Sequence, residues 1–334
     1  MKKIIDKIKK AKKIAIFSHI NPDPDALGSV VAMYHALKQL GKNPFIFLEE
    51  VPNEKFDFLD FSLFSYKIND FDFDLCVSVD CADSKRLGIF EEDFKKCDNV
   101  AIDHHSSRVS YANAEYVDGT KSSNCEILFE LFQNLKVKIT KEIATALYLG
   151  LSGDTCNFSV NSTNSASFDC ASKLLKYGAD FETVNQKTFL QRTFEETKLL
   201  SKFITSIQIE NGVGIGLVLN KDKIECGCVS YNTSEFVNMI RYINGVKIAI
   251  LIKQIGRGEY SVSLRSTTDF DVAILAGYFG GGGHKQAAGF TIKMGISKLK
   301  KQILAKAHEM VDKNENWWNC GFKQANWNEF NEGS

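Results

Sequence analysis

One short segment constrains the fold of this chain more than any other: residues 19–29, which read HINPDPDALGS. The apolar run at 14–17 before it predicts a buried strand, and the residues after it carry apolar side chains at helical spacing. The segment is therefore a turn from a strand into a helix, as in an α/β fold with parallel strands. Such folds place their binding sites beyond the carboxyl ends of the strands, so His19, Asp23 and Asp25 are candidates to face one cavity.

Two interpretations of this turn are open. Asp and Asn residues before a helix commonly cap its N-terminus, and a lone His is commonly structural. One imidazole with two carboxylates is also a ligand set for a divalent ion such as Mn²⁺ or Zn²⁺. Ligands at other strand ends would decide between the two.

Composition narrows the class of protein. The chain has 334 residues, enough for two domains, with 44% apolar and 25% charged residues and no net charge. A protein without net charge has no overall electrostatic attraction to nucleic acid or to a membrane surface. No stretch approaches the ~20 apolar residues of a membrane span, and the N-terminus does not resemble a signal peptide. Nine cysteines without a CxxC pair predict a reduced, cytoplasmic protein.

The two halves of the chain have different patterns. In the first half, strands are expected at 13–19, 44–48, 74–80 and 99–103, and helices at 25–40, 123–135, 140–152 and 165–177. This alternation predicts a mostly parallel sheet flanked by helices. In the second half, strands are expected at 206–219, 246–255, 260–264 and 290–293, and helices at 234–242, 272–279 and 297–311. That pattern predicts a smaller α+β domain.

Further acids and histidines stand at the ends of apolar segments. The run 74–80 ends in Asp80, and the run 99–103 ends in Asp103 with His104 and His105 directly after it. The apolar helix expected at 144–151 leads into Asp154. Solvated acids scatter over helix faces and loops, whereas these follow buried segments. The sequence therefore favours a metal site over a simple helix cap.

The order of these motifs resembles a known family. HxNPDxDALGS, VDCAD, DHH and GDT follow one another, and the second half contains SLRS at 263–266 and GGGGHKQAAGF at 280–290. Together they resemble the DHH phosphoesterase superfamily with a DHH-associated C-terminal domain, in the branch of nanoRNases and pAp phosphatases. The resemblance covers residues 12 to about 311.

The resemblance implies two divalent metal ions, with Mn²⁺ preferred and Mg²⁺, Co²⁺ or Zn²⁺ as alternatives. One ion would be bound by His19, Asp23 and Asp80, and the other by Asp25, Asp80, His104 and Asp154. Asp80 would bridge the two ions, because two nearby cations need a shared anionic ligand. Asp103 would hold the His104 imidazole, and His105 would face the substrate phosphate.

The resemblance also implies a substrate site in the second half. Backbone amides of Gly281, Gly282 and Gly283 would approach a phosphate closely, with charge from His284 and Arg265. A glycine run is otherwise a flexible turn, and this one lacks the Gly-Lys-Ser/Thr ending of a P-loop. The expected domains are a catalytic metal-binding domain at 1–185, a helical linker at 186–205, a substrate-binding domain at 206–312 and a Trp-rich tail at 313–334. The active site is expected in the cleft between the two domains.

The implied function is hydrolysis of very short oligoribonucleotides and dinucleotides to mononucleotides, and of pAp to AMP. Alternatives are a cyclic or linear dinucleotide phosphodiesterase, a family II pyrophosphatase, a RecJ-type exonuclease and, in another class, an inactive nucleotide-binding module. The loop at 280–289 argues against the pyrophosphatase, and zero net charge argues against a track for long nucleic acid. The expected partners are short RNA or nucleotide substrates, with no membrane and no long duplex, and a homodimer is left open. The family pattern is interrupted at Cys156-Asn157-Phe158, where small residues are expected before the aromatic one.

Overall fold

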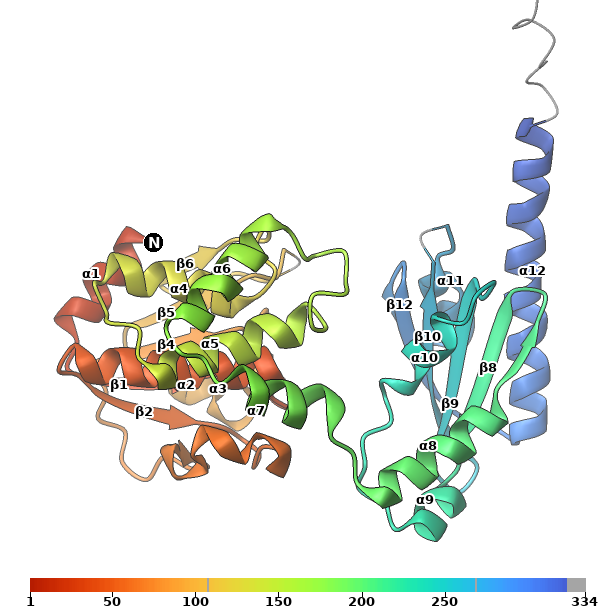
Figure 1. The fold of residues 1–334 in the computed structure, drawn as a ribbon, viewed down its shortest axis with the longest axis horizontal. Coiled ribbons are helices and arrows are strands. Elements are labelled where there is room, and N and C mark those ends of the chain that lie inside the picture. Colours follow the sequence, from red (N-terminus) through yellow and green to blue (C-terminus); the bar gives the residue numbers. More distant parts are fainter. Residues whose placement is uncertain (107, 268, 323–334) are drawn as a thin grey trace, which may run out of the picture. The chain divides into compact units, whose positions relative to one another are not determined.

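The computed structural model of this protein describes residues 1–106, 108–267 and 269–322. The chain divides into two compact units, Met1–Gln191 and Arg192–Ser334. Each unit is built on its own six-stranded sheet (Figure 1). No helix in the described part of the chain is long and apolar enough to cross a membrane.

The first sheet is entirely parallel, in the order β3-β2-β1-β4-β5-β6. Its strands are β1 Lys13–Phe17, β2 Asn43–Phe47, β3 Phe64–Ser65, β4 Leu75–Val79, β5 Asn99–Asp103 and β6 Ala114–Val117. The prediction of a mostly parallel sheet is confirmed. Strands β3 and β6 were not predicted, because β3 has only two residues and β6 lies at the sheet edge with partly exposed side chains.

Helices cover both faces of this sheet. They are α1 Lys2–Lys10, α2 Pro24–Gln39, α3 Glu91–Phe94, α4 Asn124–Asn134, α5 Lys141–Asp154, α6 Ser165–Lys176 and α7 Phe181–Asn185, with short 3-10 helices at Glu54–Leu59, Phe61–Leu63 and Ser84–Phe90. Strand side chains alternate between the faces. Ile14 and Ile16 join the core formed with α2, α4 and α5, whereas Phe17 packs in a second apolar cluster with Phe90 and Phe94.

The connections between strands determine where a site can form. From β1 the chain continues outward to β2 and β3, and then returns to place β4 on the other side of β1. The strand order therefore reverses between β1 and β4, and ligands in open α/β sheets bind outside the carboxyl ends of the strands at this kind of position. Residues 18–23 connect β1 to helix α2. Helix α2 lies close to α5, since a Cβ on Gly28 would be only 2.3 Å from the carbonyl oxygen of Ala146.

The second unit is an α+β structure whose sheet has the order β11-β12-β10-β9-β8-β7. Its strands are β7 Gln208–Glu210, β8 Val213–Val218, β9 Ile248–Gly256, β10 Glu259–Ser266, β11 Gly282–His284 and β12 Ala287–Lys293. Its helices are α8 Phe194–Ser206, α9 Asn220–Cys226, α10 Phe236–Arg241, α11 Val272–Tyr278 and α12 Ile296–Phe322. Val262, Leu264 and Phe290 face one core of this unit, and Ala249 and Leu251 face the other.

The structure differs from the expected elements in a few places. The strand expected at 206–219 is a hairpin of β7 and β8, because Asn211 (φ 46°) and Gly212 (φ 77°) form a tight turn. The segment expected as a linker contains a π-helix at Gln186–Leu190 followed by α8. Helix α12 continues past the expected boundary at 312, and the rest of the Trp-rich tail, 323–334, lies outside the described residues.

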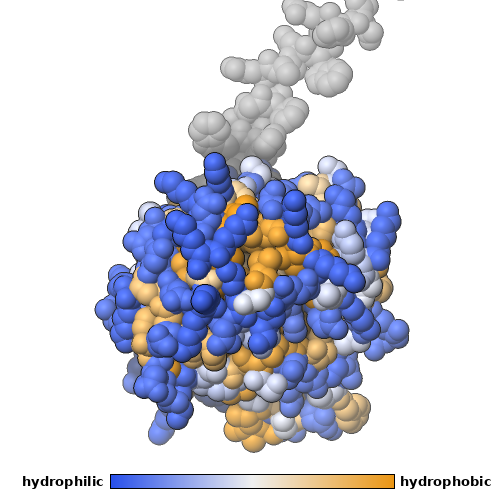
Figure 2. All heavy atoms as spheres, turned by 90° about the vertical axis from the view of Figure 1, so that its left-hand side faces the viewer, coloured by the Kyte–Doolittle hydropathy of each residue, from blue (hydrophilic) through white to orange (hydrophobic). Residues whose placement is uncertain are grey.

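One face of the molecule carries both polar and apolar side chains at its surface. Figure 2 shows a mostly hydrophilic face with smaller apolar areas between the polar side chains. Apolar area of this kind is common on folded proteins and by itself indicates no binding site.

Candidate metal centre

His19 follows β1 and is buried, with 4% of its side chain exposed. Its Nδ1 lies 2.8 Å from the carbonyl oxygen of Ile20. Because a carbonyl only accepts hydrogen bonds, Nδ1 is the donor in this contact. Nε2 lies 3.6 Å from Oδ2 of Asp23 and 3.8 Å from Oδ2 of Asp80.

Asp23 satisfies both interpretations of the turn. Its Oδ1 accepts hydrogen bonds from the amides of Asp25 and Ala26, each at 3.0 Å, and so caps α2. Its Oδ2 faces His19. Burial acts to raise the pKa of Asp23, but His19 and the two amides outweigh burial and hold the pKa below its usual value. Capping the helix therefore leaves the second oxygen of this carboxylate available to a ligand.

Asp25 lies fully buried in the first turn of α2. Its two oxygens accept hydrogen bonds from the amides of Asn124 (2.5 Å) and Cys125 (3.0 Å) at the N-terminus of α4. A helix N-terminus stabilises an anion. Burial and the nearby carboxylate of Asp154 still raise the pKa of Asp25 to about 7.

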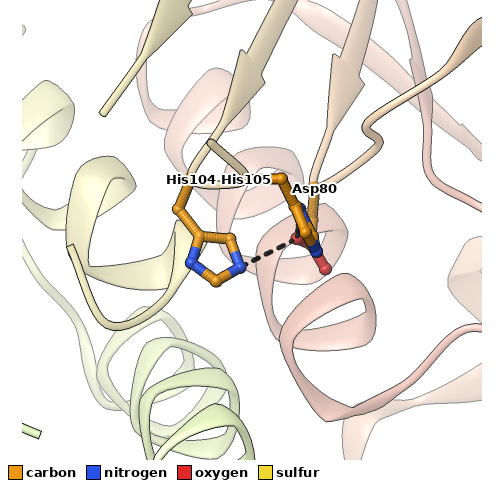
Figure 3. A group of neighbouring side chains, drawn as sticks. All are labelled: Asp80, His104 and His105. Atoms are coloured by element: carbon orange, nitrogen blue, oxygen red, sulfur yellow. Dashed lines mark ion pairs between the residues drawn. The ribbon is translucent and has the colours of Figure 1, made fainter. Parts of the chain in front are cut away.

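Asp80 follows β4 and is almost completely buried. Its backbone is in the left-handed region (φ 54°), and its amide donates a hydrogen bond to the carbonyl of Ile102 at 3.0 Å. Its two oxygens face different ways. Oδ2 faces His19, whereas Oδ1 lies 3.6 Å from Nε2 of His104 and 3.7 Å from Nδ1 of His105 (Figure 3). Burial and the surrounding carboxylates, with Asp25 the largest of them, raise the pKa of Asp80 well above its usual value.

His104 brings further carboxylates into this group. Its Nε2 lies 3.0 Å from Oδ2 of Asp154 and 3.9 Å from Oδ2 of Asp25. Its Nδ1 lies 3.4 Å from the carbonyl oxygen of Lys121. Burial acts to lower the pKa of His104, but Asp154 and Asp25 outweigh it and raise the pKa to about 9.

The expected role of Asp103 needs correction. Its Oδ1 contacts Nδ1 of His105 at 2.8 Å, and not the His104 ring. The same oxygen also accepts a hydrogen bond at 3.3 Å from the amide of His105, so a local turn after β5 brings residue i+2 back to Asp103. Asp103 therefore orients His105, and the carbonyl of Lys121 orients His104.

The donor atoms fit divalent cations. Three sets of donors each lie within 4.8 Å of one another: His19, Asp23 and Asp80; Asp25, His104 and Asp154; Asp80, His104 and His105. Donor pairs of 3.0–3.9 Å match the separations expected around one ion with bonds of ~2.1 Å. Within the described residues, Oδ1 of Asp80 is buried without a hydrogen-bond partner. Carboxylates this close repel one another unless a cation or a proton neutralises them.

The residues that position Asp25 were missed from the sequence. A Cβ on Gly150 would lie 2.4 Å from Oδ1 of Asp25 and 2.3 Å from Sγ of Cys125, so only glycine leaves room for this carboxylate beside α5. Gly150 could have been singled out from the sequence. A glycine inside a helix lowers helix stability by ~1 kcal/mol relative to alanine, so its presence usually has a packing reason. The amides of Asn124 and Cys125 gave no such signal, since every residue has an amide.

The departure at Cys156-Asn157-Phe158 is a turn with unusual backbone geometry. All three residues have positive φ angles of 44°, 53° and 64°. Residues other than glycine rarely adopt this region, so three in a row form an uncommon turn. The turn follows Asp154 at the end of α5.

The residues expected to bind substrate lie in the second unit. Arg265 on β10 pairs with Ala287 on β12, which pairs with His284 on β11. Arg265 and His284 therefore lie on one face of the sheet, two strands and about 10 Å apart. Packing explains two of the glycines: a Cβ on Gly281 would lie 2.3 Å from the carbonyl oxygen of Gly289, and Gly283 has a φ of 145° with β12 backbone close by. Gly282 has open space around its Cβ position.

Comparison with known proteins identifies two domains in the order of the motifs. Residues 13–151 match the DHH family, N-terminal domain, and residues 228–313 match the DHHA1 domain. A bifunctional oligoribonuclease and PAP phosphatase NrnA of Thermus thermophilus is 28% identical over 305 residues, covering 89% of each chain.

Solved structures agree with the fold. An exopolyphosphatase-related protein from Bacteroides fragilis superposes with a TM-score of 0.85 at 22% identity, covering 93% of this chain and 97% of the other. RecJ from Thermus thermophilus, solved in complex with Mn²⁺, has a TM-score of 0.53 at 14% identity, covering 93% of this chain and 54% of RecJ. The chain therefore carries an N-terminal DHH domain followed by a DHHA1 domain.

Proposed function

We propose that this protein is a two-metal phosphoesterase that hydrolyses very short oligoribonucleotides and dinucleotides to mononucleotides, and pAp to AMP. The observation that carries the proposal is the convergence of imidazole and carboxylate donors on both oxygens of Asp80, at the ends of β1, β4 and β5. The substrate class is supported by a relative named as an oligoribonuclease and PAP phosphatase, which aligns along 89% of the chain.

The proposed ligands divide between two ions. His19, Asp23 and Asp80 would bind one ion, and Asp25, Asp80, His104 and Asp154 would bind the other. Mn²⁺ is the first candidate because the donor set mixes imidazole with carboxylate, with Mg²⁺, Co²⁺ or Zn²⁺ as alternatives. The RecJ structure solved with Mn²⁺ is consistent with this choice.

Bound divalent ions would supply Lewis-acid stabilisation of the phosphate and a water of lowered pKa. The protein's own residues supply position. Asp103 holds Nδ1 of the partly exposed His105, which leaves Nε2 of that ring for a substrate phosphate. Arg265, His284 and the amides of Gly281, Gly282 and Gly283 would bind the phosphate or the nucleotide of the substrate. Arg265 suits this role because its guanidinium donates two parallel hydrogen bonds to a phosphate.

A side-by-side assay with Mn²⁺ tests the proposal. We expect AMP from pAp and mononucleotides from pApA, with rates falling as RNA length increases. A cyclic dinucleotide should be cleaved poorly, and preferential cleavage of it would favour the alternative phosphodiesterase. A uniform rate on RNAs of all lengths would contradict the short-substrate proposal.

The proposal includes a cytoplasmic location. It is supported by eight cysteines of the described residues, none of which takes part in a disulfide bond. The homodimer stays a prediction, for which sedimentation of the full chain is the measurement.

A further inference from the structure

Two cysteines lie in contact away from the candidate metal centre. Cys76 is the second residue of β4 and is buried, and Cys97 lies two residues before β5 and is partly exposed. Their sulfur atoms are 3.2 Å apart, within hydrogen-bond distance. They are 21 positions apart in the sequence and share no motif, so only the fold brings them together.

The backbone fixes this pair. The amide of Cys76 donates a hydrogen bond to the carbonyl of Asp98 at 2.9 Å, and Cys76 is in register with Asn99 where β4 pairs with β5. Cys76 belongs to the apolar cluster around Phe17 and Phe94, and Cys97 packs at its edge. A disulfide bond measures about 2.05 Å, so the sulfurs need to approach by only about 1 Å.

We propose that Cys76 and Cys97 form a reversible disulfide when the protein meets hydrogen peroxide. The Cys97 thiolate attacks the peroxide, giving a sulfenic acid and hydroxide. The Cys76 thiol then attacks the sulfur of that sulfenic acid and releases water. The two thiols lose two electrons and two protons in total, and the peroxide is reduced to two waters.

The exposure and acidity of the two thiols agree with this order of events. Cys97 is the one that solvent reaches. Its hydrogen bond with Cys76 lowers the pKa of the Cys97 thiol, whereas the same contact and burial raise the pKa of Cys76. Peroxide reacts with thiolates, so Cys97 is the first to be oxidised and Cys76 resolves the product.

The bridge would close a segment that supports the metal centre. The loop between Cys76 and Cys97 contains Arg86, whose carbonyl accepts a hydrogen bond at 2.7 Å from the amide of Ile20, directly after His19. Asp80 lies four residues beyond Cys76, at the other end of β4 and about 13 Å away. The disulfide is therefore expected to slow unfolding of the first unit without changing the hydrolytic site.

The test treats the full-length protein with a small molar excess of hydrogen peroxide, blocks remaining thiols and maps peptides by mass spectrometry. We expect a peptide pair linked through Cys76 and Cys97, 2 Da lighter than the two thiols and released by dithiothreitol. The oxidised protein should melt about 5–10 °C higher than the reduced protein. Its rate of pAp hydrolysis should change by less than about twofold.

Two variants control the experiment. Cys97→Ser should abolish the linked peptide and the thermal shift, whereas Cys156→Ser, which removes an exposed cysteine of the same unit, should retain both. The proposal is overturned if the wild-type protein yields Cys97 sulfinic acid without the linked peptide, or if Cys97→Ser shows the same thermal shift. Because the peptide map uses the wild-type chain, the result does not depend on how the variants fold.

Discussion

At the scale of single residues, Asp80 connects the whole candidate centre. Its left-handed backbone turns the carboxylate into the space between His19 and His104, so that each oxygen faces one of the two imidazoles. A non-glycine residue in this conformation costs of order 1–3 kcal/mol. Such strain is retained where the position serves a function, and the proposed bridging of two ions would give Asp80 that function.

Replacing this carboxylate tests the bridge. Asp80→Asn keeps the shape and tolerates the left-handed backbone, but it removes the charge. We expect pAp hydrolysis to fall by about 10³-fold or more, because both ions lose a ligand. Bound Mn²⁺ per chain should also fall, as measured by atomic absorption. Near-normal activity with full metal content would exclude the bridging role.

The same variant should be more stable than the wild type when metal is chelated. The Asp80 carboxylate is buried among other carboxylates that repel it, and this cost is avoided by the neutral amide. Thermal unfolding in chelator measures this difference and separates loss of function from loss of fold.

The raised pKa values of Asp25 and His104 predict how stability depends on pH. For Asp25 (pKa about 7), the stabilisation is fully present below the unfolded-state pKa of ~3.9 and is lost as the pH rises through 7. For His104 (pKa about 9), it is fully present below ~6.5 and is lost as the pH rises through 9. The chelated protein should therefore melt at progressively lower temperatures from pH 5 to pH 9.

Added Mn²⁺ should oppose the fall in melting temperature between pH 5 and pH 9. Metal binding needs deprotonated ligands, so the melting temperature gained on adding Mn²⁺ should increase over the same pH range. Thermal unfolding at pH 5, 7 and 9, with Mn²⁺ or with chelator, measures both effects. A chelated protein that gains stability between pH 5 and pH 9 would contradict the assignment.

At the scale of elements, three helices hold one carboxylate. Asp25 lies on α2, accepts hydrogen bonds from the N-terminus of α4, and fits against α5 only where Gly150 has no side chain. The hydroxyl of Ser123 caps α4 by accepting a hydrogen bond from the amide of Glu126 at 3.1 Å, which keeps the amides of that first turn in place. The position of Asp25 is therefore set by helix packing.

Adding a methyl group at Gly150 tests whether helix packing positions Asp25. Gly150→Ala places a Cβ against Asp25 and Cys125, so we expect a loss of ~1–3 kcal/mol in the free energy of unfolding. Displacement of Asp25 should also reduce Mn²⁺ affinity by ~10–100-fold. Calorimetry with and without metal measures both quantities.

Gly277→Ala in α11 is the matched control, because its Cβ would meet no atom within 4 Å. It should stabilise the protein by up to ~1 kcal/mol. A neutral effect of Gly150→Ala on metal affinity would show that Asp25 does not depend on this contact.

At the scale of the whole molecule, the proposed metal binding and the proposed substrate binding belong to different units. All proposed metal ligands belong to Met1–Gln191, whereas Arg265 and His284 belong to Arg192–Ser334. Each unit has its own apolar cores, so a change at the surface of one leaves the packing of the other intact.

This division predicts separable defects. Arg265→Ala should raise the KM for pAp by ~10–100-fold, as expected when a charged hydrogen bond to phosphate is lost. The thermal shift on adding Mn²⁺ should match that of the wild type, and Arg265→Lys should recover part of the KM. If Arg265→Ala instead abolishes the Mn²⁺ shift, the two tasks are not separate.

Much of the fold was predictable from local sequence. The apolar runs before His19, Asp80 and Asp103 mark β1, β4 and β5, because a buried parallel strand is a short continuous apolar segment. Strands β3 and β11 were not predictable from local sequence, because segments of two or three residues show no periodicity of apolar side chains. The turn at Asn211-Gly212 carried a hairpin signal that the long apolar segment around it obscured.

The sequence by itself determined which side chains are candidate ligands, because each lies at or shortly after the end of an apolar segment that becomes a strand or helix of the core. Only the tertiary structure decided which atom faces which. The partner of Asp103 is His105 because the turn after β5 brings both the amide and the ring of His105 to Oδ1 of Asp103. Asp25 meets the amide of Asn124, 99 positions away, because α2, α4 and α5 pack together. The contact between Cys76 and Cys97 likewise exists only because β4 pairs with β5. Such contacts depend on how elements distant in the sequence pack, which local patterns do not encode.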